Sequence, residues 1–210
     1  MIKKNILLFF VRWPEPGKVK SRLAASVGTE QACRIHRHLA ECCYKNARFT
    51  PNTRLIVSGT GAPPASFQQW LPGADDYWEQ PQTDLGERLR IFFFNAFEAG
   101  ATSVAAIGSD CPTLLSPSMA NAFLALQSHD VAALPASDGG YVWIGSSWYI
   151  PELFSNISWG TEKVMAETRI KCRELDLSLW EGESFEDIDH EEEWLRYVNN
   201  HPEPPQASPT

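Results

Sequence analysis

The sequence lacks long apolar runs and paired-cysteine motifs. Its 210 residues include five cysteines, and none of them forms a C-x-x-C pair. This odd, scattered set predicts neither a disulfide framework nor a zinc site, and it favours a reducing compartment. The apolar run from Ile6 to Val11 is too short for a membrane span or a secretory signal, and Arg12 follows it directly. We therefore expect a soluble, cytoplasmic protein that has no membrane partner.

Positive charge is scarce as well. The chain carries 26 acidic and 18 basic residues, which gives a formal net charge of −8. Nucleic-acid binding depends on neutralising many phosphates, so an acidic chain without a large basic patch is not expected to bind nucleic acid. The one local basic cluster, Lys18, Lys20 and Arg22, is large enough for one or two phosphates. This composition favours a small phosphorylated ligand.

Several common active-site motifs are absent. The chain has no G-x-x-x-x-G-K-S/T loop, no G-x-G-x-x-G dinucleotide fingerprint and no G-x-S-x-G nucleophile turn. Its five histidines show no metal-binding spacing. These absences exclude a P-loop, a dinucleotide fingerprint and a nucleophile turn as the basis of function.

What the sequence does contain is an alternation of strand-like and helix-like segments. Strands are expected at 5–11, 53–58, 76–79, 103–108, 130–136, 141–145 and 177–180, and helices at 29–48, 64–71, 85–99, 116–128, 162–175 and from about 190 to 199. Strict alternation in the first two thirds predicts a mostly parallel sheet. The segment after Gly139-Gly140 breaks the alternation, so we expect one antiparallel strand. We expect a single α/β domain over residues 1–200 and a disordered tail over 201–210, which holds four prolines.

A lone acid, Asp110, follows the apolar strand 103–108 and stands just before Cys111-Pro112. In open α/β sheets, ligands bind at the carboxyl ends of the strands. This position favours a functional carboxylate, and the structural alternative is an aspartate that caps the turn before proline.

Two further loops offer cationic side chains at the ends of expected elements. Gly17 lets backbone amides approach an anion, and Lys18, Lys20 and Arg22 add charge, so this loop suits a phosphate. The structural alternative is an exposed basic turn. Arg88 follows a helix start that is already explained by capping, and a guanidinium there would suit a phosphate.

Carboxylates near phosphates favour a hard divalent cation, since Mg²⁺ takes one or two carboxylates and completes its sphere with substrate oxygens and water. Asp110 and Asp189 are the expected metal ligands, although Asp189 also fits a helix N-cap with Glu192 three residues on. Asp138 is placed beside Gly139-Gly140, where either a ligand or a plain tight turn would explain the glycines.

These segments together resemble a known family. The matching stretches are PEPGKVKSRL (14–23), DLGERL (84–89), IGSDCPTL (107–114), SDGGYVWIG (137–145), WGT (159–161) and EDIDHEEEW (186–194). They are similar to the GT-A-type transferases described as glycosyltransferase-like, cofactor-biosynthesis-guanylyltransferase-like proteins, also called rSAM/selenodomain-associated transferases. The resemblance covers roughly residues 5–198. It implies a nucleotide-diphospho-sugar transferase fold, a three-layer Rossmann-like α/β/α sandwich.

By this resemblance, Asp110 corresponds to the metal-binding acid of GT-A enzymes, and Asp189 to a second metal-facing acid of related nucleotidyltransferases. The chain departs from the family pattern after Asp189, where His-Glu-Glu replaces Thr-Pro-Glu, and at Lys20-Ser21-Arg22, where serine replaces threonine. The implied cofactor is Mg²⁺ or Mn²⁺.

The first expected function is therefore a metal-dependent transferase that uses a nucleotide sugar and a small-molecule acceptor, with Asp138 as an acceptor-side base. The alternative is a nucleotidyltransferase that joins a nucleoside triphosphate to a phosphorylated small molecule and releases pyrophosphate. A third hypothesis is a non-catalytic nucleotide-binding module, which would be expected to have lost the metal acid or the basic loop.

Overall fold

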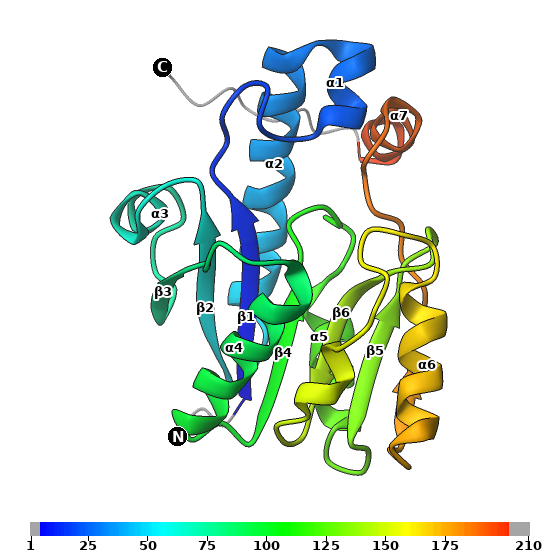
Figure 1. Cartoon of the computed structure of the whole chain (residues 1–210). Helices are drawn as coiled ribbons and strands as arrows, with labels where there is room; N and C mark the ends of the chain where they lie inside the picture. Colours follow the sequence, from blue (N-terminus) through cyan, green and yellow to red (C-terminus); the bar gives the residue numbers. More distant parts are fainter. Residues whose placement is uncertain (1–4, 202–210) are drawn as a thin grey trace.

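The computed structural model describes residues 5–201, so the expected disordered tail lies, apart from His201, outside the described residues. Seven strands form one sheet in the order β3-β2-β1-β4-β6-β5-β7 (Figure 1). The strands are β1 (Asn5–Arg12), β2 (Thr53–Thr60), β3 (Asp76–Glu79), β4 (Ser103–Ile107), β5 (Val131–Pro135), β6 (Tyr141–Ser146) and β7 (Leu179–Glu181).

Strand β6 runs antiparallel to both of its neighbours, β4 and β5, whereas the other paired strands are parallel. The prediction of one antiparallel strand in a mostly parallel sheet is confirmed. The local cause is the short connection between β5 and β6, which has no room for a crossover helix. Gly139 in this turn has a φ of +91°, a conformation that favours glycine.

Helices cover both faces of the sheet. They are α1 (Ser21–Val27), α2 (Thr29–Arg48), α3 (Pro64–Trp70), α4 (Leu85–Glu98), α5 (Ser116–Ala125), the 3₁₀ turn η1 (Pro151–Phe154), α6 (Val164–Glu174) and α7 (Glu191–Asn200). Helices α2, α3 and α5 pack on one face, and α4, η1 and α6 on the other. The predicted three-layer α/β/α sandwich is confirmed.

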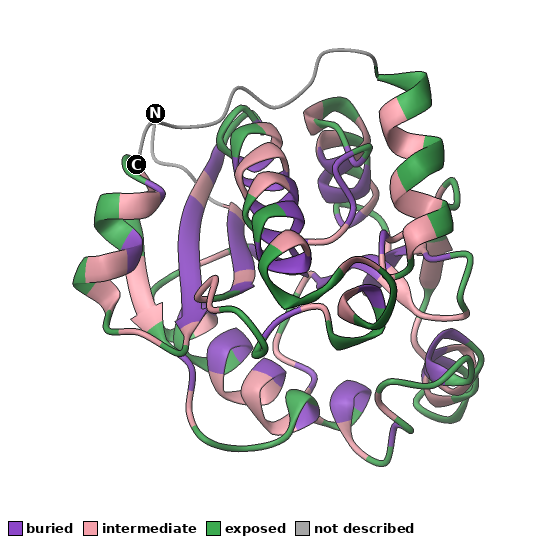
Figure 2. Cartoon of the chain, turned by 90° about the horizontal axis from the view of Figure 1, so that it is seen from above, coloured by how far each residue is buried: buried purple, intermediate pink, exposed green. Residues whose placement is uncertain are grey.

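The central strand β1 shows why its sequence is apolar throughout. Leu7 and Phe9 pack towards α2, whereas Ile6 and Leu8 pack towards α4, and all four are buried. A strand covered on both faces needs apolar residues at every position. Figure 2 shows the buried positions gathered inside the molecule, with exposed positions on the outer turns of the helices.

A third apolar cluster lies above the carboxyl edge of the sheet and joins segments distant in sequence. Leu23 of α1, Ile35 and Leu39 of α2, and Ile188 are buried together, and Trp194 of α7 packs against them. Figure 1 shows α1 and α7 side by side at this end, where β1 and β4 terminate. The cluster therefore fixes the loop before α1 and the loop before α7 next to each other.

The helix starts agree only in part with the sequence-based expectations. No helix was expected between the strand at 5–11 and the helix at 29–48, but α1 begins at Ser21, because Pro14, Pro16 and Gly17 all precede it and Leu23 is anchored in the third cluster. The expected helix starts at 29 and 116 agree with the first residues of α2 and α5, Thr29 and Ser116.

Asp189 was a candidate N-cap of the last helix, but His190 holds that position. The Glu193 carboxylate accepts hydrogen bonds from the backbone N–H groups of Asp189 and His190. The capping box is therefore shifted by one residue from the expected pair, and it leaves the Asp189 side chain to face the site.

Candidate nucleotide and metal site

A cavity of about 490 Å³ opens at the carboxyl edge of the sheet. It is lined by the end of β1 and the loop after it, by the last residue of β2, and by the residues that follow β3 and β4. The starts of α1 and α4, one residue of α2 and the loop before α7 complete the lining. The predicted site residues found in its lining are Gly17, Lys18, Lys20, Arg22, Arg88, Asp110 and Asp189. The structure thus brings together every predicted site residue except Asp138.

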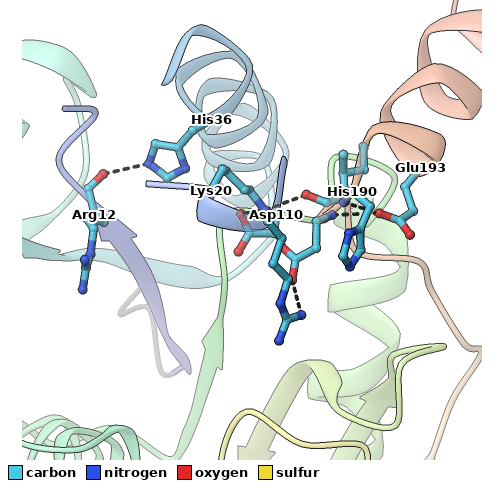
Figure 3. Close-up of polar contacts among 9 residues, drawn as sticks. Arg12, Lys20, His36, Asp110, His190 and Glu193 are labelled. Carbon is cyan, nitrogen blue, oxygen red and sulfur yellow. Dashed lines mark hydrogen bonds and ion pairs between the residues drawn. The ribbon is translucent and has the colours of Figure 1, made fainter. Parts of the chain in front are cut away.

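The centre of the cavity is an ion-pair network built on Lys20. Its ammonium lies 2.6 Å from Asp110 Oδ1 and 2.8 Å from Asp189 Oδ1, and it also donates to the carbonyl oxygen of Ile188 at 2.6 Å (Figure 3). The Lys20 side chain is only 5% exposed, whereas the Asp110 and Asp189 side chains are 38% and 39% exposed. Two carboxylates therefore face the cavity while a buried cation holds them together.

The backbone positions these groups from three separate loops. Lys20 has a φ of +49°, which is uncommon for a residue other than glycine and costs on the order of 1 kcal/mol. Strain of this kind is concentrated at functional sites. The N–H of Ile188 donates to the carbonyl oxygen of Asp110 at 3.0 Å, so the loops after β4 and β7 are tied directly.

The network also determines protonation. Burial acts to lower the Lys20 pKa, but Asp110 and Asp189 outweigh it and hold that pKa above its usual value. Burial acts to raise the Asp189 pKa, whereas Lys20 and then Arg22 lower it, and the net result is a pKa below the usual range. The ammonium and the Asp189 carboxylate are therefore both charged at neutral pH.

Further cations surround the network. Arg22 Nη1 lies 3.3 Å from Asp189 Oδ2, and Lys18 Nζ lies 2.9 Å from Glu15. Arg88 Nη1 donates to Gln80 Oε1 at 3.1 Å, while its Nε is buried and has no partner within the described part of the chain. A buried donor without a partner costs stability, and Arg88 is among the residues that line the cavity.

Three of the lining residues that were not expected from the sequence make specific polar contacts. Arg12 is the last residue of β1 and donates through Nη1 to the carbonyl oxygen of Lys18 at 3.1 Å. His36 lies 3.0 Å through Nε2 from the Arg12 carbonyl oxygen (Figure 3), and burial lowers its pKa. The Gln80 amide donates to Ser58 O at 2.6 Å. His36 occurs in the apolar stripe of α2, so its spacing indicates core packing and gives no functional signal.

Asp138 lies in the β5–β6 turn and lines neither this cavity nor its neighbour. Its Oδ1 accepts from the N–H of Gly140 at 2.9 Å, which is a turn-forming bond. A Cβ on Gly139 would lie 2.2 Å from the carbonyl oxygen of Glu162, so the close packing of this turn explains the glycine.

A second cavity of about 200 Å³ adjoins the first. Both are lined by Phe10, Leu85, Gly108 and Asp110, and most of the remaining lining of the second is apolar. Asp187 also lines it, and burial together with the nearby Asp110 and Asp138 raises the Asp187 pKa to about 7. Asp110 therefore stands at the boundary of a cationic cavity and an apolar one.

The fit of a divalent cation can be judged from the Lys20 network. Asp110 and Asp189 already converge on one cation, and both keep exposed oxygens. Within residues 5–201, no group of three or more His, Cys, Asp or Glu side chains is set to hold a metal. Two carboxylates fit Mg²⁺ or Mn²⁺ that gains its other ligands from phosphate and water, and they do not fit a metal held by protein atoms alone.

The fold and the site define an α/β protein of the nucleotide-diphospho-sugar transferase class. Residues 45–161 match the family described as uncharacterized protein conserved in bacteria (DUF2064), and the chain belongs to this family. A candidate nucleotide-diphospho-sugar transferase from Desulfovibrio desulfuricans G20 is 32% identical, with a TM-score of 0.83, over 89% of this chain and 83% of that one. The predicted resemblance is confirmed, and the chain has the fold and family of a transferase.

More distant solved structures share the fold. A CMP:2-keto-3-deoxy-manno-octonic acid synthetase complexed with CTP is 10% identical, with a TM-score of 0.61, over 95% of this chain and 99% of that one. Rv0371c from Mycobacterium tuberculosis H37Rv, in complex with manganese, is 15% identical, with a TM-score of 0.59, over 93% of this chain and 98% of that one. No curated protein matches the sequence. Within residues 5–201, no helix is long and apolar enough to cross a bilayer.

Proposed function

We propose that this protein is a metal-dependent transferase whose nucleotide donor binds in the larger cavity. The observation that carries the proposal is the convergence of Lys20, Asp110 and Asp189 at the carboxyl edge of the sheet, inside a rim of further cations. A non-catalytic module would be expected to have lost the acids or the basic loop, whereas here both are present and in contact.

Asp110 and Asp189 would hold the metal, which would neutralise charge on the departing phosphate. Lys18, Arg22 and Arg88 line the cavity and would bind the donor's phosphate oxygens. The Lys20 ammonium, which now pairs with both carboxylates, would be available to the donor phosphates where those carboxylates bind a cation instead.

A nucleotide sugar is the first candidate donor. The Desulfovibrio desulfuricans relative of this chain is described as a candidate nucleotide-diphospho-sugar transferase, and the second cavity offers room for an acceptor beside Asp110. In this reaction the acceptor oxygen bonds to the anomeric carbon as the bond from that carbon to the phosphate oxygen breaks. The nucleoside diphosphate leaves with the electron pair, and the acceptor proton passes to water.

A nucleoside triphosphate is the second candidate donor, and the charge of the larger cavity favours it. Five cationic side chains line this cavity against two carboxylates. The cationic residues are Arg12, Lys18, Lys20, Arg22 and Arg88. A triphosphate carries more negative charge than the diphosphate of a nucleotide sugar, so it balances this excess better. Here an acceptor oxygen would attack the α-phosphate, and pyrophosphate would leave with the electron pair.

Titration calorimetry with Mn²⁺ tests the proposal and separates the two donors. Nucleotide sugars and nucleoside triphosphates are titrated into the wild type, Asp110→Asn and Lys45→Ala, an exposed lysine on α2 outside the cavity lining. We expect metal-dependent binding in the wild type and Lys45→Ala, and loss of the metal dependence in Asp110→Asn. Binding of sugar nucleotides alone identifies the first donor, and binding of triphosphates alone identifies the second. Metal-dependent binding that persists in Asp110→Asn refutes the metal assignment.

A further inference from the structure

We propose that the second cavity is the acceptor subsite, and that the acceptor is a neutral alcohol with a compact apolar body. This inference rests on the proposed function, because it takes the larger cavity as the donor site. It goes further by assigning a chemical class to the acceptor.

The volume and lining of the cavity carry the first step. At about 200 Å³ it admits a small molecule, and its walls come from both cores of the protein, including Leu89 and Ile144 on one side and Leu114 and Val142 on the other. Apolar walls bind apolar surface through the removal of that surface from water. The ligand therefore has an apolar body.

The charge of the residues that line the second cavity indicates that its ligand is uncharged. Lys, Arg and His are absent from the residues that line this cavity, whereas Asp110 and Asp187 are both present. A phosphorylated or carboxylated molecule would bring negative charge into an apolar space beside two acids, at a considerable electrostatic cost. The acceptor that fits this cavity is uncharged at its buried end, in contrast to the phosphates expected in the larger cavity.

Two polar groups carry the third step. Within the described residues, the Tyr141 and Asp187 side chains show no hydrogen bond to another protein group, and both residues line the cavity. Tyr141 contacts the Trp159 ring edge-on, with ring centroids 6.3 Å apart, which fixes its orientation. Polar side chains that line a cavity without a protein partner are complementary to a ligand hydroxyl, which both donates and accepts.

The position of Asp110 completes the argument. This acid lines both cavities, so an alcohol in the smaller cavity would present its oxygen next to the group that leaves the donor phosphate. The new bond forms from the alcohol oxygen to the transferred group. The bond from that group to phosphate breaks with its electron pair on the phosphate, and the hydroxyl proton goes to water.

Methyl NMR with a matched probe pair tests this assignment. Benzyl alcohol and benzyl phosphate share one apolar body and differ in charge, and each is titrated while the Leu89 and Ile144 methyl signals are followed. We expect saturable shifts with benzyl alcohol and at least tenfold weaker binding of benzyl phosphate. Equal or tighter binding of the phosphate at these methyls overturns the neutral class of acceptor.

Two variants locate the binding. Ala106→Leu places three more carbon atoms in the cavity wall and should weaken benzyl alcohol at least tenfold, whereas Ala125→Leu, the same change on α5 outside both linings, should not. Tyr141→Phe keeps the volume and should weaken the alcohol about three- to tenfold, the loss of one hydrogen bond. This second variant stays informative if Ala106→Leu does not fold. Unchanged benzyl alcohol affinity in folded Ala106→Leu, or in Tyr141→Phe, contradicts the subsite.

The same titration in the presence of nucleotide distinguishes a failure of the acceptor subsite from a failure of the proposed donor site. With Mn²⁺ and saturating nucleotide, benzyl alcohol should keep its affinity, since acceptor and donor occupy different cavities. Displacement of the alcohol by a nucleotide sugar would show that the donor sugar fills this space, and the acceptor inference would fail while the donor site stands. Nucleotides that fail to bind, beside alcohol that still does, would refute the proposed donor site alone.

Discussion

Removal of the Lys20 ammonium is the most informative single change in this protein. Lys20→Ala would leave Asp110 and Asp189 facing each other without the cation that now lies 2.6 Å and 2.8 Å from them. Breaking a buried ion pair on one side costs about 3–5 kcal/mol. Both acids here are more than a third exposed, so water screens part of their repulsion, and we expect a loss of about 2 kcal/mol.

The expected loss of stability in Lys20→Ala is large enough to measure, and a divalent cation should reverse part of it. For a chain of this length, about 2 kcal/mol lowers the melting temperature by about 4–8 °C. A divalent cation that binds the freed carboxylates stabilises the folded state by mass action. Differential scanning calorimetry should therefore show that Mn²⁺ raises the melting temperature of Lys20→Ala more than that of the wild type, where metal must first displace the ammonium.

The control is Lys45→Ala, which removes an exposed lysine of α2 outside the cavity lining. This variant should keep the wild-type melting temperature and the wild-type increase of that temperature with Mn²⁺. The reasoning is refuted if Lys20→Ala melts at the wild-type temperature. It is refuted equally if Mn²⁺ stabilises the variant and the wild type to the same extent, because the two carboxylates would then not be the metal ligands.

Three other predictions concern the turn residues and a carboxylate far from the site. Gly139→Ala should lower the free energy of unfolding by about 2–4 kcal/mol in urea titrations, since its Cβ would meet the Glu162 carbonyl oxygen at 2.2 Å; a loss below about 0.5 kcal/mol contradicts this. Asp130 accepts three hydrogen bonds, those from Ser178 first, which hold its pKa below the usual range. Asp130→Ala should therefore lower the free energy of unfolding by about 1–2 kcal/mol at pH 7. The difference from wild type should fade as the pH falls below about 4, because the stability that a depressed carboxyl pKa provides is lost on protonation. A difference in the free energy of unfolding that does not change with pH would contradict this prediction. If Asp138 is the acceptor-side base, Asp138→Asn should lower kcat by about 10²-fold or more at unchanged donor affinity; full turnover would leave it only the turn bond to Gly140.

The sequence predicts the parts of this site that follow from strand ends and local chemistry. Asp110 could be placed because an apolar strand is expected just before it, and Lys20 because a basic loop follows the first strand. The pairing of Asp110 with Asp189 was predicted from the chemistry of a divalent cation and from the family resemblance. No local pattern shows that they meet, because 78 residues lie between them in the sequence. Whether the loops that carry these residues lie next to each other depends on the order of the strands in the sheet, which is a tertiary property.

Other features depend on packing that has no local signal. Arg12 looks like the end of a strand and His36 like a member of an apolar helix stripe, yet the two are bonded to each other beside the cavity. The α1 start at Ser21 was missed because Leu23 is stabilised by Ile188, a residue from the other end of the chain. The second cavity is formed by side chains from at least four elements, and a space between elements leaves no pattern in the sequence.

The ion pairs of Lys20 explain both the strain in its backbone and the position of Asp110 at the boundary of the two cavities. A lysine in a left-handed conformation is costly, and it is maintained here because its ammonium satisfies two carboxylates and one carbonyl oxygen at once. The result is that Asp110 is held between a cationic space and an apolar one, with one oxygen engaged and more than a third of its side chain exposed. Charged phosphates are favoured on one side of this acid and disfavoured on the other. Under the proposed function, this asymmetry would hold a charged donor and a neutral acceptor on opposite sides of Asp110, and it would be lost if the smaller cavity carried a cation.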